Sequence, residues 1–136
     1  MILRTKFFKQ YLFLSFLLLF GGCSVWENFT TYFNLYYNTA SIFEDAENEI
    51  LTQKRDLFSN EPLVVSGAAK TNLIKVVEKA SKLLQFYSNT SYVDEALMML
   101  GKSFYYQNNY QKSIRKFEEL LATNPEDEIA TEANLW

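Results

Sequence analysis

The clearest hydrophobic pattern of the chain lies in residues 91–125 and predicts two helices joined by a short turn. Ser91 and Asp94 have the spacing of a capping box, which marks the start of the first helix. Asn108-Asn109 is expected to end that helix, because Asn tolerates turn geometry. The apolar residues of the first helix recur at intervals of three and four, so they share one face: Leu97, Leu100 and Phe104.

A second helix is predicted from Tyr110 to the residues before Pro125, because proline cannot continue a helix. Two short helices in this order bury a shared apolar stripe, which favours an all-α fold class. The expected buried face of the second helix is Tyr110, Ile114, Phe117, Leu120 and Leu121.

Upstream, the spacing predicts one long amphipathic helix over Glu27–Asp56, a loop over Arg55–Ala69 and a helix over Ala69–Tyr87. The polar face of the long helix is acidic, whereas helices that lie on membranes favour Lys and Arg. Packing in a protein core is therefore favoured over a membrane-surface role. The apolar face is Phe29, Phe33, Tyr36 or Tyr37, Ala40, Phe43, Ala46 and Ile50.

The chain repeats itself with an offset of 37 residues. Three pairs carry the pattern: Val76 with Ser113, Ala80 with Phe117, and Leu83 with Leu120. The same offset relates Glu95-Ala96 to Glu132-Ala133 and Met99 to Trp136. We therefore expect residue 136 to fall in the middle of a repeat, in a piece of a longer protein. The last helix is expected to expose its apolar side, including Ala133 and Trp136.

These residues resemble the tetratricopeptide repeat, a helix–turn–helix unit of about 34 residues that stacks into an α-solenoid. The resemblance implies close helix packing at Gly101, where a side chain would push the two helices apart. Residues 29–87 are then a degenerate first repeat with an inserted loop, residues 88–127 a tetratricopeptide repeat, and residues 128–136 the start of the next. The implied packing residues are Leu97, Leu100, Gly101, Phe104, Tyr110, Ser113, Phe117 and Pro125.

The N-terminus reads MILRTKFFKQYLFLSFLLLFGGC, with three basic residues, a short apolar run and a glycine pair before the only cysteine. This order predicts a secretory signal peptide over residues 1–22. The end of the segment resembles the lipobox of bacterial lipoproteins, which implies lipidation of Cys23 and a tether over residues 23–28. An uncut membrane anchor and a plain signal peptide with an incidental cysteine remain alternatives.

Charge and composition limit the classes of partner and of chemical site that we expect for this protein. Without the three basic residues of the signal peptide, 10 Lys and Arg remain against 16 Asp and Glu, a formal net charge of −6. Such an acidic domain gains nothing from counterion release, so nucleic acid is not an expected partner. Histidine is absent and no glycine-rich phosphate motif occurs, so we expect no catalytic residue, no metal site and no cofactor.

A lipobox followed by such repeats is similar to the layout of BamD-like outer-membrane assembly lipoproteins. That resemblance implies a lipid-anchored scaffold on the periplasmic face of the outer membrane, which binds proteins or peptides of the cell envelope. The segment TTYFNLYYNT also resembles SprE-type repeat lipoproteins linked to gliding and type IX secretion. The N-terminal scaffold of a longer periplasmic enzyme is a further alternative. The implied partner-binding groove comprises Glu95, Met98, Lys102, Tyr105 and Tyr106.

Replacing Cys23 with serine is expected to abolish lipidation, because the thiol that carries the lipid is lost. Two or more acyl chains hold a protein stably on a membrane, so the variant should move to the soluble fraction. Metabolic labelling with a radioactive fatty acid, followed by fractionation, measures both effects. Absence of label on the wild-type protein would contradict the lipoprotein interpretation.

Overall fold

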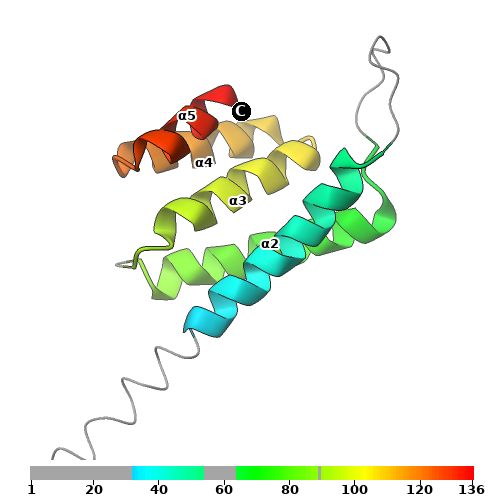
Figure 1. Cartoon of the computed structure of the whole chain (residues 1–136), viewed down its shortest axis with the longest axis horizontal. Coiled ribbons are helices and arrows are strands. Elements are labelled where there is room, and N and C mark those ends of the chain that lie inside the picture. The colour runs from blue at the N-terminus through cyan, green and yellow to red at the C-terminus, as the bar shows by residue number, and fades with distance from the viewer. Residues whose placement is uncertain (1–31, 54–63, 89) are drawn as a thin grey trace, which may run out of the picture. The chain divides into compact units, whose positions relative to one another are not determined.

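The computed structural model describes residues 32–53, 64–88 and 90–136, and this part of the chain is helical without β-strands (Figure 1). The all-α class is therefore confirmed. The chain divides into two compact units, Met1–Phe33 and Asn34–Trp136, and nearly all of the described residues belong to the second. The predicted signal peptide, Cys23 and the tether over residues 23–28 lie outside the described residues, as does most of the predicted loop.

The described helices are a first helix over residues 32–51, α2 (Gly67–Phe86), α3 (Val93–Tyr106), α4 (Tyr110–Ala122) and α5 (Asp127–Leu135). The first helix and α2 form one helical hairpin, α3 and α4 form the next, and α5 follows. Along this series α3 packs on both α2 and α4, and α5 packs on α4 and α3. The order is that of successive tetratricopeptide repeat hairpins.

Helix α3 is the centre of the packing. Every residue from Ala96 to Gly101 is buried, because α2 covers one side of the helix and α4 covers another. A helix that is apolar around its circumference suits such a position. On the first side the cluster is Phe43, Ala46, Ile50, Ala69, Leu73, Val76, Met99 and Tyr106. On the second side it is Leu97, Met98, Phe117, Leu120 and Ala133.

Two predicted helix starts are wrong. Helix α2 begins at Gly67, two residues earlier than predicted, because the Ser66 hydroxyl accepts a 3.0 Å hydrogen bond from the backbone N–H of Ala69. Helix α3 has Tyr92 as its N-cap and lacks a side-chain cap, so the Ser91 capping box does not form. The Asp94 carboxylate instead accepts a 2.6 Å hydrogen bond from the Thr123 hydroxyl, so a contact with the end of α4 replaces the local one.

The helix ends follow the sequence more closely. The predicted break at Asn108-Asn109 is confirmed, and Asn108 takes the left-handed backbone conformation with a φ of 58°. Asn tolerates this conformation better than most residues. A second asparagine, Asn124 with a φ of 56°, follows the end of α4 and precedes Pro125. One asparagine with a left-handed backbone conformation therefore lies in the turn before α4, and another lies in the turn after it.

The predicted buried face of α4 is partly wrong. Tyr110 is 52% exposed and Ile114 is 57% exposed, whereas Ser113, Phe117 and Leu120 are buried. The helix is rotated so that its small residue, Ser113, faces α3. The Ser113 hydroxyl donates a 2.8 Å hydrogen bond to the backbone carbonyl of Gly101, which fixes that rotation.

The first helix and α5 also depart from their predicted faces. Phe43, Ala46 and Ile50 are buried as predicted, and Tyr36 packs against their cluster, but Phe33 is 39% exposed. Ala133 of α5 was expected to be exposed, and it is only 4% exposed because it packs in the second cluster. Trp136 is 38% exposed, and its ring makes edge contacts with Tyr105 and Tyr106.

Gly101 marks the closest approach of α3 to α4. A Cβ atom built on Gly101 would lie 2.5 Å from Cε1 of Phe117, closer than real Cβ contacts come. The ring of Phe117 is itself buried, so it has little room to move aside. The absence of a side chain at Gly101 is therefore a packing requirement, as the sequence indicated.

Gly101→Ala is expected to destabilise the fold although alanine is the better helix former by about 1 kcal/mol. Gly101→Leu should cost about 3 kcal/mol, at the top of the usual range for overpacking. Combining Gly101→Ala with Phe117→Leu should recover part of the loss, since the colliding ring is removed. Urea unfolding followed by circular dichroism measures each change.

The matched control is Gly67→Ala, because a Cβ at Gly67 meets no atom within 4 Å. That variant should be neutral or stabilising by up to about 1 kcal/mol. Equal unfolding midpoints for Gly101→Ala and Gly67→Ala would contradict the close approach at Gly101.

Candidate functional site

A cavity of about 260 Å³ opens between the first helix, α3 and α5, which we call the leading helices. Its lining combines four carboxylates with apolar side chains, and we call Met98, Met99 and Ile129 its apolar floor. We call it the acidic cavity. Its lining residues are Tyr36, Phe43, Glu44, Glu47, Glu95, Met98, Met99, Ile129 and Glu132.

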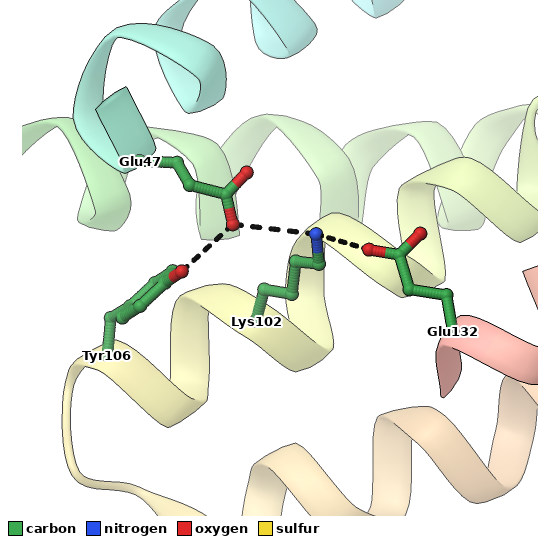
Figure 2. Close-up of polar contacts among 4 residues, drawn as sticks. All are labelled: Glu47, Lys102, Tyr106 and Glu132. Carbon is green, nitrogen blue, oxygen red and sulfur yellow. Dashed lines mark hydrogen bonds and ion pairs between the residues drawn. The ribbon is translucent and has the colours of Figure 1, made fainter. Parts of the chain in front are cut away.

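Lys102 bridges two of the carboxylates that line this cavity, which come from two other helices (Figure 2). Its Nζ atom lies 2.5 Å from Glu132 of α5 and 3.5 Å from Glu47 of the first helix. The Lys102 side chain is only 11% exposed. Its ammonium also lies 5.8 Å from the centre of the Phe43 ring and 5.1 Å from that of the Trp136 ring. One lysine thus ties three successive leading helices together.

Tyr106 also contacts the Glu47 carboxylate. Its hydroxyl donates a 2.9 Å hydrogen bond to Oε1 of Glu47, the oxygen that also faces Lys102 (Figure 2). Burial raises the pKa of the Tyr106 hydroxyl, and the hydrogen bond to Glu47 raises it further. The phenol therefore stays protonated and remains a donor. The Oε1 atom of Glu47 therefore has two partners within the protein.

Glu95, by contrast, has a carboxylate oxygen without a hydrogen-bond partner among the described residues. This oxygen, Oε2, is buried. Burial raises the pKa of the Glu95 carboxyl above its ordinary value; its own backbone N–H lowers it, while Asp94 and Glu126 add repulsion. A buried polar atom without a partner carries a desolvation cost of about 1–3 kcal/mol. Glu95 thus places a carboxylate with an unsatisfied oxygen in the lining of the cavity.

The five residues predicted to form a partner-binding groove take different positions. Glu95 and Met98 line the acidic cavity. Lys102 and Tyr106 contact Glu47 inside the protein, and Tyr105 packs its ring against Tyr110 and Trp136. The structure therefore brings two of the five to the cavity and uses the others to hold the helices together.

Sequence reasoning missed the carboxylates from the neighbouring helices. Glu132 could have been found, since the offset of 37 residues relates it to Glu95. Glu44 and Glu47 belong to the acidic polar face predicted for the long helix, and only the folded arrangement brings them to α3. The described residues contain no group of His, Cys, Asp and Glu that could hold a metal ion. They also contain no helix with the length and hydropathy needed to cross a membrane.

Residues 94–127 match the tetratricopeptide repeat family model. The match covers nearly all of α3, all of α4 and the turn that follows, so the central hairpin is the matched repeat. Searches of curated proteins and of solved structures gave no significant match.

The predicted repeat-packing residues fall within or at the edge of the buried hairpin. Phe104 and Pro125 are half-buried, and Tyr110 is exposed on one side while its ring contacts Tyr105. The remaining positions are buried: Leu97, Leu100, Gly101, Ser113 and Phe117.

Lys102→Met is expected to lower the free energy of unfolding by about 2 kcal/mol. Breaking a fully buried ion pair typically costs about 3–5 kcal/mol, and the half exposure of Glu132 reduces that effect. The control is Lys82→Met, which removes an exposed pair with Glu78 on α2 and should change stability by less than about 0.5 kcal/mol. Urea unfolding of both variants measures the two changes in the free energy of unfolding. Equally small changes would show that Lys102 does not tie the helices together.

Glu95→Gln is expected to stabilise the fold at pH 7. A carboxyl whose pKa is raised in the folded state binds its proton more tightly there, so stability is lost as pH rises through that pKa. Glutamine removes the charge, and the gain should disappear below the ordinary pKa of 4.5, where Glu95 is protonated in both states. Thermal unfolding between pH 3.5 and 8 tests this, with Glu118→Gln on the exposed face of α4 as control. A gain in stability that is the same at every pH would contradict the raised pKa of Glu95 as its cause.

Proposed function

We propose that the protein is a repeat scaffold that binds partner polypeptides in the acidic cavity. Tetratricopeptide repeats generally mediate protein–protein binding and are generally not enzymes, and the central hairpin matches that family. The single observation that carries the proposal is the cavity itself, which combines an apolar floor with the unpartnered Oε2 atom of Glu95. Apolar surface with a few placed polar groups is typical of binding sites.

We further propose that the scaffold works at the cell envelope, anchored through lipid on Cys23 to the periplasmic face of the outer membrane. The support is the N-terminal sequence and its similarity to BamD-like lipoproteins, which favours a role in outer-membrane protein assembly. The TTYFNLYYNT segment supports a component of gliding or type IX secretion machinery as the second candidate. The partner recovered from cells distinguishes the two.

Site-specific photo-crosslinking in cells tests the binding site. Tyr36 lines the cavity, whereas its neighbour Tyr37 is half exposed and does not. Benzoylphenylalanine at position 36 is expected to capture a defined envelope protein, because a bound segment would lie against that side chain. The same probe at position 37 should capture far less. Equal capture at both positions, or none at position 36, would contradict binding in the cavity.

A further inference from the structure

We infer that the acidic cavity binds a lysine or arginine side chain of the partner polypeptide. This inference rests on the proposed function and names the chemistry that the site recognises. Its basis is the volume of the cavity, its charge, and the manner in which the protein already holds one of its own lysines beside it.

Lys102 shows how a cation is held at this surface. Its ammonium lies between the carboxylates of Glu47 and Glu132, near the rings of Phe43 and Trp136. Aromatic faces attract cations, and the aliphatic stem of a long basic side chain packs well on apolar surface. The lining of the acidic cavity offers the same combination of carboxylates and apolar side chains, without a cation from the described part of the chain.

The carboxylates that remain available are Glu44 and Glu95. Neither forms an ion pair with any described residue, whereas Glu47 and Glu132 share Lys102. Glu44 is exposed, and Glu95 has its Oε2 atom buried in the wall. A guanidinium or ammonium group that enters the cavity would hydrogen-bond to these two carboxylates, neither of which has a cationic partner among the described residues. Charge-assisted hydrogen bonds of this kind are about twice as strong as neutral ones.

The size and charge of the site exclude other ligands. Four carboxylates face a single bridging lysine, so an acidic or phosphorylated segment would be repelled. A volume of about 260 Å³ is below the roughly 300–1,000 Å³ of sites that enclose drug-sized molecules. It suits one long side chain, whose aliphatic stem would contact Met98, Met99 and Ile129. The rest of the partner would then pass along the outer surface of the leading helices.

The test is a selection of random twelve-residue peptides on the full chain, purified from membranes in detergent. Selected peptides are expected to share a lysine or arginine. One such peptide is then synthesised, and its binding is measured by fluorescence anisotropy. Replacing its basic residue with norleucine, which keeps the stem and removes the charge, should weaken binding at least tenfold.

On the protein side, Glu95→Gln should also weaken binding of this peptide at least tenfold, while Glu118→Gln leaves it unchanged. Loss of binding by Glu95→Gln cannot be ascribed to unfolding, because that variant is expected to be more stable than the wild type. A substitution that stabilises the fold and weakens binding is the signature expected of a residue kept for recognition.

Three results would overturn the inference: selected peptides without a common basic residue, unchanged binding by Glu95→Gln, or spermidine binding as tightly as the peptide. The last result would assign the site to a small polyamine. If position 36 crosslinks to peptides that lack basic residues, this inference fails and the scaffold function stands. If no peptide crosslinks at position 36, the proposed function fails as well.

Discussion

The rest of this structure depends on the contact between Gly101 and Phe117. Because Gly101 has no side chain, the ring of Phe117 lies directly on α3 and α4 approaches closely. Phe117 then forms an apolar cluster with Leu97 and Met98 that receives Ala133 of α5. Glu132, the neighbour of Ala133, thereby comes within 2.5 Å of Lys102. A missing side chain on one helix thus decides where a carboxylate of another helix stands.

The sequence predicted what local patterns control. Helical spacing, the Asn108-Asn109 break and the small residue Gly101 indicated the hairpin, and its position agrees with the matched repeat. The rotation of α4 was not predictable, since apolarity alone favoured Tyr110 and Ile114 over Ser113. What decides it is the hydrogen bond from Ser113 to the Gly101 carbonyl, which belongs to the folded pair of helices.

The site was less predictable than the fold for the same reason. Glu47 and Tyr106 are 59 residues apart, and no periodicity in the sequence relates them. On the sequence alone Glu47 belonged to an acidic polar face and Lys102 to a groove open to a partner. Folding pairs them with each other and leaves Glu95 as the carboxylate with an unfilled hydrogen-bonding position. Only the tertiary structure therefore shows which charged residues pair with each other and which could bind a partner.

Glu95 connects stability with recognition in this account. An ionised carboxylate in a partly buried wall weakens the fold, and a cation from outside would relieve that cost. The binding free energy would then include relief of a penalty that the free protein carries. This arrangement favours partners that bring a positive charge over partners that bring only apolar contacts.

The most direct measurement is the pKa of the Glu95 carboxyl, followed by ¹³C nuclear magnetic resonance in the full chain with and without a bound basic peptide. In the free protein burial holds this pKa above its ordinary value. Our account predicts that a lysine- or arginine-containing peptide lowers the pKa of Glu95, since a nearby cation favours the charged form. A Glu95 pKa that stays the same or rises on saturation with the peptide would contradict the account.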